Sequence, residues 1–108
     1  MWLPNVHKEN IQMKKYELMA IFPIEDDKSK AGIEAVKSVL TQFGASVEKE
    51  ESYGDRDLTY EVKKQKRGRF VLFTINANPA KIVEINNQFR LTDNLLKSLF
   101  VNIDEKKN

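Results

Sequence analysis

Short apolar runs alternate along the chain with amphipathic stretches, and their order predicts a fold. Residues 16–22 form an apolar run that Pro23 ends, which indicates a strand. Because apolar residues occupy both alternating sets of positions in this run, we expect a central strand. Residues 70–75 repeat the pattern and predict a second inner strand.

Two stretches have the spacing of amphipathic helices. The first follows Asp26 and Asp27, either of which is expected to cap its N-terminus, and Gly44 is expected to end it. The second follows Asn78, expected at the cap, with Pro79 at the first helical position. The apolar stripes are Ile33, Val36, Leu40 and Phe43 in the first helix and Ile82, Ile85 and Phe89 in the second.

The remaining elements complete the pattern. Residues 46–62 predict a long polar strand, bent near Gly54, whose charges indicate a sheet edge or a half-exposed face. The basic segment 63–69 is expected to form the hairpin turn that follows, and residues 95–103 predict the last strand. The order βαββαβ predicts an α+β, ferredoxin-like arrangement, in which two helices cover one face of a four-stranded antiparallel sheet.

A chain of 108 residues has the length of one domain. Residues 1–12 show no periodic pattern, and we interpret them as an N-terminal extension that is either disordered or the result of a start assigned upstream of Met13. Residues 13–104 are the predicted domain, and residues 105–108 are a short charged tail.

The composition narrows the possible chemistry. The chain has no cysteine, which excludes disulfides, thiol catalysis and Cys-ligated metals. His7 is the single histidine, which argues against a His-rich metal site or a Ser–His–Asp triad. No apolar run approaches the roughly 20 residues that span a bilayer. We therefore expect a cytoplasmic protein with no cofactor, no metal and no membrane partner.

Groups suited to catalysis are scarce. Five carboxylates could pair as acid and base, but each lies in a charged stretch typical of solvated surface. Acylphosphatase-like enzymes share the predicted fold, but their phosphate-binding glycine loop with an Arg is replaced by residues 23–27, PIEDD. We expect a protein that is not an enzyme and has no small-molecule substrate. The five carboxylates are Asp26, Asp27, Glu48, Glu50 and Glu51.

The net charge of +2 is too small to indicate nucleic-acid binding, but its distribution is uneven. Residues 63–69, KKQKRGR, are strongly basic, and cations on a protruding turn can neutralise phosphates. A solvated hairpin tip is the alternative interpretation. Tyr16, Phe70 and Phe73 lie on predicted strands, as do the base-stacking residues of RNA-recognition modules, although core packing is the more common use of such side chains.

The predicted inner strands are apolar on both sides, whereas the helices can cover only one face of the sheet. An exposed apolar sheet face of this kind indicates a partner surface. A second copy of the chain and a different protein fit equally well. One function that such a surface allows is that of a dimeric, ferredoxin-like regulatory domain that senses a small molecule, and we keep it as the alternative.

Four segments, in order and with matching gaps, resemble the bacterial small-subunit ribosomal protein S6 family. They are MKKYE at 13–17, GASVE at 44–48, GDRDLTYEV at 54–62 and FRLTDNLLKSL at 89–99. The resemblance covers residues 13 to about 103. It implies a cytoplasmic, structural constituent of the small ribosomal subunit that binds the central domain of the ribosomal RNA together with ribosomal protein S18.

By position, the resemblance implies RNA contacts for basic residues near the first strand, the central glycine and the last turn, with Tyr16 shared between packing and RNA. Asp57 stands where a neutral or basic residue is frequent in the family, which is expected to weaken contact locally. The family commonly has Leu-Ala-Tyr-Pro-Ile where residues 58–62 read LTYEV. With the basic segment added, the predicted RNA-binding residues are Lys14, Lys15, Tyr16, Arg56, Lys63, Lys64, Lys66, Arg67, Arg69, Arg90 and Lys97.

Overall fold

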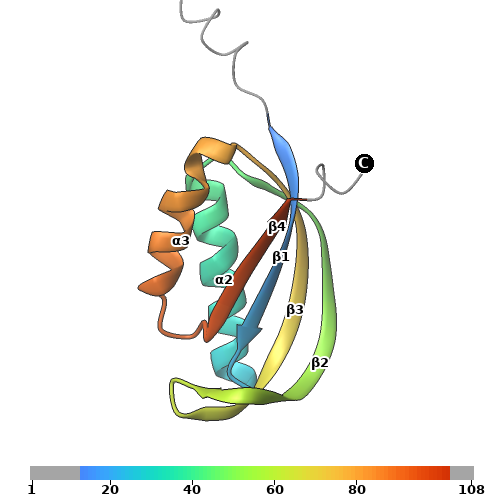
Figure 1. Cartoon of the computed structure of the whole chain (residues 1–108), viewed down its shortest axis with the longest axis vertical. Helices are drawn as coiled ribbons and strands as arrows, with labels where there is room; N and C mark the ends of the chain where they lie inside the picture. Colours follow the sequence, from blue (N-terminus) through green and yellow to red (C-terminus); the bar gives the residue numbers. More distant parts are fainter. Residues whose placement is uncertain (1–12, 103–108) are drawn as a thin grey trace, which may run out of the picture.

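Four strands pair in the order β2-β3-β1-β4, and the two helices lie together on one side of this sheet (Figure 1). The computed structural model describes residues 13–102, so the predicted extension 1–12 and tail 105–108 lie outside the described residues. The ferredoxin-like βαββαβ prediction is confirmed. The elements are β1 (Lys14–Phe22), α2 (Asp26–Gln42), β2 (Ser46–Val62), β3 (Gln65–Ala77), the 3₁₀ turn η1 (Pro79–Lys81), α3 (Ile82–Arg90) and β4 (Lys97–Asn102).

The two apolar runs form the inner strands, as predicted. β1 and β3 are antiparallel along the whole of β1, from Lys14 opposite Ala77 to Phe22 opposite Arg69. β4 pairs with the other edge of β1, and β2 pairs with the other edge of β3. Each inner strand therefore has a hydrogen-bonded neighbour on both sides, which suits an apolar sequence.

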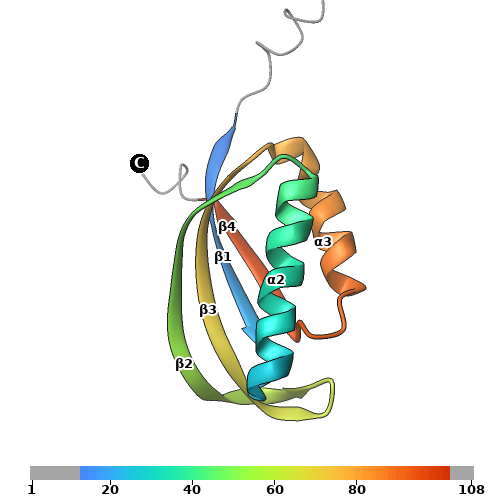
Figure 2. The ribbon, with the colours of Figure 1, turned by 180° about the vertical axis from the view of Figure 1, so that it is seen from behind.

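Alternate residues of the inner strands form the core beneath the helices, which lie side by side over them (Figure 2). The side chains of Leu18, Phe22 and Phe73 are fully buried there. Phe100 of β4 packs between two aromatic rings, edge-on to Tyr16 at 6.1 Å and parallel to Phe89 at 6.0 Å. The core thus joins β1, β3 and β4 to both helices, whereas the polar edge strand β2 contributes no residue to it.

The two helices begin differently. The residue that caps α2 is Glu25, which makes no side-chain hydrogen bond to the helix, so the expectation that Asp26 or Asp27 caps it was wrong. Both aspartates lie in the first turn, where their charges stabilise the positive end of the helix dipole. Asn78 does cap the second helical segment, because its side chain accepts a hydrogen bond from the amide of Ala80 at 2.9 Å.

Helix α2 lies unusually close to the chain that leads into β4. A Cβ atom on Gly32 would lie 2.2 Å from the carbonyl oxygen of Asn94 and 2.7 Å from Cδ1 of Phe22. Only glycine permits this approach. The loop between α3 and β4 is fixed further by a hydrogen bond from the amide of Leu96 to the carbonyl of Ile21 at 2.7 Å.

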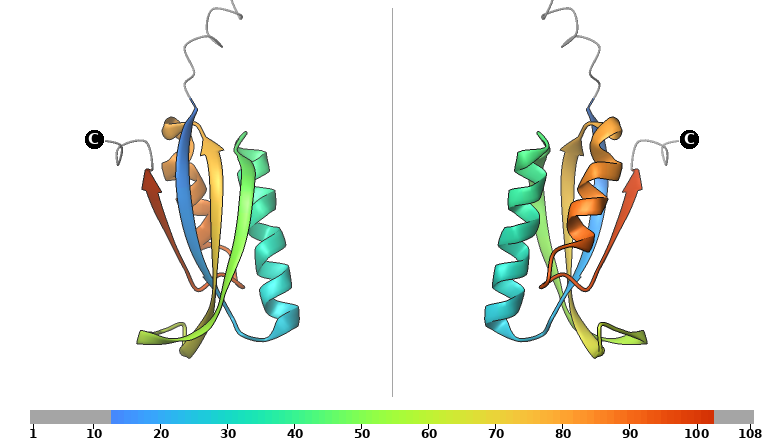
Figure 3. Two further views of the ribbon diagram at one scale, coloured as in Figure 1. Left: turned by 90° about the vertical axis from the view of Figure 1, so that its right-hand side faces the viewer. Right: turned by 90° about the vertical axis from the view of Figure 1, so that its left-hand side faces the viewer.

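The long edge strand β2 is irregular. Its register against β3 shifts at three places, one of them between Ser52 and Gly54, so the predicted bend near Gly54 is confirmed. The last shift, between Asp57 and Val62, leaves residues 58–61 without partners on β3. Here the end of the β2–β3 hairpin turns aside beneath the start of β4 (Figure 3).

Candidate nucleic-acid interface

The tight turn of the β2–β3 hairpin is shorter than expected. It consists of Lys63 and Lys64 alone, because β3 already begins at Gln65, so the expectation of a turn over residues 63–69 was wrong. Both lysines have positive φ angles, 49° and 66°. This is the geometry of a two-residue type I′ turn, whose twist matches that of the strands it joins. The rest of the basic segment lies on β3.

The turn lies against the loop between α3 and β4. The Lys63 ammonium donates a hydrogen bond to the carbonyl of Leu95 at 2.9 Å and a longer one to that of Thr92 at 3.4 Å. These bonds join residues that are about 30 positions apart in the sequence. The hairpin tip is therefore attached to the body of the domain, close to the end of α3.

This attachment brings three predicted RNA-binding residues around one hollow of about 430 Å³. Lys63 comes from the turn, Arg90 from the last turn of α3 and Lys97 from the first position of β4. No acidic side chain lines the hollow within the described part of the chain. We call it the cationic groove; its lining residues are Lys63, Asn86, Phe89, Arg90, Leu95, Leu96, Lys97 and Ser98.

The cations of the groove differ in their hydrogen-bond partners within the protein. The ammonium of Lys63 is held by carbonyl oxygens, which leave its charge uncompensated. Among residues 13–102, the side chains of Arg90 and Lys97 have no hydrogen-bond or ion-pair partner, and both residues are exposed. Three uncompensated positive charges around one concave surface can bind an anion such as a phosphate group.

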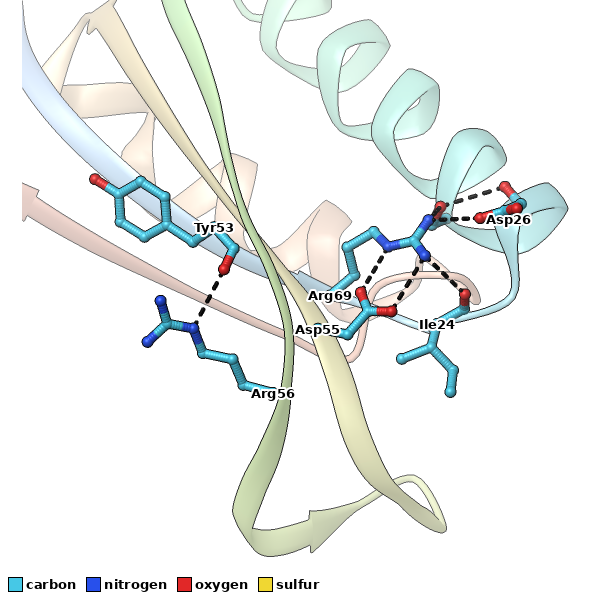
Figure 4. Close-up of polar contacts among 7 residues, drawn as sticks. Ile24, Asp26, Tyr53, Asp55, Arg56 and Arg69 are labelled. Carbon is cyan, nitrogen blue, oxygen red and sulfur yellow. Dashed lines mark hydrogen bonds and ion pairs between the residues drawn. The ribbon is translucent and has the colours of Figure 1, made fainter.

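Arg69 has a different environment from the groove residues. Its Nε and one Nη donate to the two carboxylate oxygens of Asp55, at 2.8 and 3.3 Å (Figure 4). The other hydrogen bonds go to the Asp26 carboxylate, the Ser29 hydroxyl and the Ile24 carbonyl, at 2.9 to 3.1 Å. All five N–H groups of the guanidinium are thus used within the protein.

The hydrogen bonds around Arg69 change the acidity of their partners. The bond from Arg69 lowers the pKa of the Asp55 carboxyl below its ordinary value, and the positive charges of Arg69 and Arg67 act in the same direction. The bonds to Asp55 and Asp26 raise the pKa of Arg69 further above its usual range. Arg69 therefore ties the base of the hairpin to the start of α2, and this structural role accounts for its presence in the basic segment.

The other predicted residues are spread over the molecule. Arg67 pairs with Asp57 at 3.2 Å, and Lys15 pairs with Glu48 at 3.3 Å. The Arg56 guanidinium donates to the carbonyl of Tyr53 at 3.2 Å, on the side of β2 opposite the Arg69 cluster (Figure 4). None of these residues lines the cationic groove. Lys14, Lys64 and Lys66 also lie outside it.

Tyr16 lies in the core. Only 7% of the residue is exposed, and its ring packs edge-on against Phe100. Of the three strand aromatics considered for base stacking, Phe73 is also fully buried beneath the helices, whereas Phe70 is partly exposed on the other side of the sheet. Tyr16 and Phe73 therefore serve core packing in this fold.

The side of the sheet away from the helices, which we call the uncovered face, is apolar at its centre. Met19 of β1 lies opposite Leu72 of β3 and Leu99 of β4, and Ile21 lies opposite Phe70. Leu99 is 59% exposed, and the other four are partly buried. Figure 3 shows that no helix or strand of residues 13–102 covers this face. The predicted exposed apolar sheet surface is thus present.

Sequence reasoning missed two residues that the fold brings to this end of the molecule. Asn86 precedes Arg90 by one helical turn and lines the same groove, a spacing that could have been recognised on α3. Tyr60 is 81% exposed on the unpaired part of β2. Its exposure depends on the register shift after Asp57, which no local pattern indicates.

Residues 13–102 contain neither a candidate metal site nor a candidate membrane-spanning helix. No group of three or more His, Cys, Asp or Glu side chains there is arranged to hold a metal ion. No helix in that range has the length and apolar character needed to cross a membrane.

Comparison with known proteins identifies relatives over nearly the whole described range. The family model described as ribosomal protein S6 matches residues 15–102. Small ribosomal subunit protein bS6 of Treponema denticola is 48% identical over 93 residues, which cover 86% of this chain and 100% of the relative. The bS6 protein of Treponema pallidum strain Nichols is 41% identical over 92 residues, covering 85% and 99%.

One solved structure supports the fold independently. The crystal structure of 30S ribosomal protein S6 from Thermotoga maritima matches with a TM-score of 0.75, covering 89% of this chain and 94% of that one. Its sequence identity is 22%, so this match bears on the fold alone.

Proposed function

Because the chain belongs to the ribosomal protein S6 family, it is a structural protein of the bacterial small ribosomal subunit, and we propose that it binds the subunit's RNA through the cationic groove. The convergence of Lys63, Arg90 and Lys97 on one hollow, which no acidic side chain of the described residues lines, supports this proposal. These residues come from the hairpin turn, the end of α3 and the start of β4, so only the folded domain presents them together. The proposed role involves binding without turnover.

We propose further that a companion protein, ribosomal protein S18, docks on the uncovered face. The apolar centre formed by Met19, Leu72 and Leu99 supports this assignment, because contiguous exposed apolar surface is typical of protein interfaces. Charged residues surround this centre, with Glu17 and Lys49 in the next register row and Lys97 at the end toward the groove. A polar rim around an apolar centre is the usual anatomy of such an interface.

The RNA proposal is tested with a fragment of the central domain of small-subunit ribosomal RNA and purified ribosomal protein S18. We expect the double variant Arg90→Glu, Lys97→Glu to bind this fragment at least tenfold more weakly than the unmodified protein, because two attractive charges become repulsive. The variant Lys28→Glu, Lys30→Glu, on the exposed start of α2, is the charge-matched control.

Equal loss of affinity in the two double variants would contradict the assignment to the groove, since it would reflect net charge alone. A tight homodimer without affinity for the RNA would favour the dimeric regulatory alternative. Size-exclusion chromatography of the isolated protein distinguishes that case.

A further inference from the structure

A second, smaller hollow lies beside the cationic groove, and we call it the hairpin cleft. Ile21 and Phe70 of the uncovered face form one side, and Leu58, Tyr60 and Val62 of β2 form the other. The hollow has a volume of about 200 Å³. It exists because residues 58–61 leave the ladder with β3 and the hairpin turns aside.

The packing under the cleft brings its two sides close together. A Cβ atom on Gly68 would lie 2.3 Å from Cγ2 of Ile21 and 3.5 Å from Cδ2 of Leu58. The missing side chain therefore lets Ile21 and Leu58 approach the same point of β3. Ile21 and Leu58, one from each side of the cleft, thus meet over Gly68.

Tyr60 is the most exposed large hydrophobic residue among residues 13–102, at 81%. Tyr60 lines the cleft, and Lys97 lines both the cleft and the cationic groove. Tyr60 thus lines the same hollow as Lys97, one of the three proposed phosphate-binding cations. Asp57 also lines the cleft, but its carboxylate is paired with Arg67 at 3.2 Å.

We infer that the hairpin cleft binds one unpaired RNA base, stacked on Tyr60, while the neighbouring phosphates lie in the cationic groove. This inference rests on the proposed RNA-binding function. Unstacked bases bind proteins by stacking on exposed aromatic rings, with cations along the backbone. The cleft is smaller than the roughly 300–1,000 Å³ pockets that hold drug-sized ligands, which suits a single ring system.

An apolar side chain of a companion protein is the competing occupant. The continuity of the cleft with the cationic groove favours the nucleic acid, because Lys97 serves both hollows and no acidic residue among positions 13–102 lines the groove. Phosphate and base belong to one ligand, so a nucleotide segment satisfies the cations and the aromatic ring together. A protein side chain would occupy the cleft without using the groove.

The test measures affinity for the central-domain RNA fragment, with ribosomal protein S18 present, for Tyr60→Ala, Tyr60→Phe and Tyr53→Ala. Tyr53 is a suitable control because it is also an exposed tyrosine of β2 but lies outside the cleft. We expect Tyr60→Ala to bind roughly five- to 150-fold more weakly, the range for losing one base–aromatic stack. Tyr60→Phe keeps the ring and should bind as the unmodified protein does, as should Tyr53→Ala.

The salt dependence separates stacking from charge. Tyr60→Ala removes no charge, so its affinity should fall with salt as steeply as that of the unmodified protein. Unchanged affinity of Tyr60→Ala would overturn the inference and leave the proposed function intact, whereas failure of the unmodified protein to bind the RNA would overturn the proposed function itself. If Tyr60→Ala weakens binding to ribosomal protein S18 in the absence of RNA, the cleft belongs to the protein partner and the inference is wrong.

Discussion

The Arg69 guanidinium holds the Asp55 carboxylate by two hydrogen bonds, Nε to Oδ1 at 2.8 Å and Nη2 to Oδ2 at 3.3 Å (Figure 4). Asp55 belongs to β2 and Arg69 to the strand beside it, and Arg69 also contacts Asp26 at the start of α2. The pair therefore fixes the base of the hairpin whose tip carries Lys63. Arg69, predicted from the sequence to contact RNA, thereby helps to position Lys63, another predicted RNA-binding residue.

Substitution of Asp55 by Asn should destabilise the protein in a pH-dependent way. The pKa of Asp55 is lowered in the folded protein, so its contribution to stability is present above the ordinary carboxyl pKa and is lost as the pH falls through the folded value. We expect Asp55→Asn to unfold at lower urea concentration than the unmodified protein at pH 7, and this difference to shrink below about pH 4.

Urea titrations between pH 7 and pH 3 measure this effect. Asp93→Asn is the matched control, because Asp93 is exposed and has no ion-pair or hydrogen-bond partner among residues 13–102. A difference between Asp55→Asn and the unmodified protein that stays constant over this pH range would show that the ionised pair is not its cause.

Replacement of Lys64 by Gly should stabilise the hairpin. Lys64 has a φ of 66°, a conformation that costs a residue with a side chain about 1–2 kcal/mol and glycine almost nothing. Since glycine also makes the unfolded chain more flexible, we expect a net gain of about 0.5–1 kcal/mol in the free energy of unfolding. Lys63→Gly should gain less, because it also loses the hydrogen bonds to Leu95 and Thr92. Urea denaturation of both variants decides the matter, and a less stable Lys64→Gly would refute the type I′ turn.

Gly32→Ala should destabilise the domain although alanine favours helices. The added Cβ would meet the carbonyl oxygen of Asn94 and the ring of Phe22, and overpacking of this kind costs about 1–3 kcal/mol. Helix propensity alone would give the opposite sign, a gain of about 1 kcal/mol. The free energy of unfolding from urea titration therefore has a predicted sign, and a more stable variant would contradict the close packing of α2 on the loop before β4.

The sequence was sufficient for the architecture because local patterns encode it. The apolar runs around Leu18 and Phe73 specify inner strands, and Asn78 followed by Pro79 marks a helix start. The close approach at Gly32 could not be predicted, since it depends on Asn94, which is 62 positions away in the chain (94 − 32).

The candidate site was predictable only in part. Arg90 and Lys97 were chosen by resemblance, and the fold places them in one groove. The basic segment suggested five equivalent cations, but the alternation of strand β3 and the partners on β2 separate them: Arg69 serves the fold, whereas Lys63 reaches the groove. The charge pattern along the sequence does not predict such tertiary contacts.

The central claim is that the cationic groove binds RNA phosphates, and the salt dependence of affinity tests it most directly. The triple variant Lys63→Met, Arg90→Met, Lys97→Met should be compared with the unmodified protein on the central-domain RNA fragment, with ribosomal protein S18 present. If each groove cation neutralises one phosphate, the slope of log affinity against log salt should become shallower by about 2 to 3. Parallel lines for the two proteins would contradict the claim.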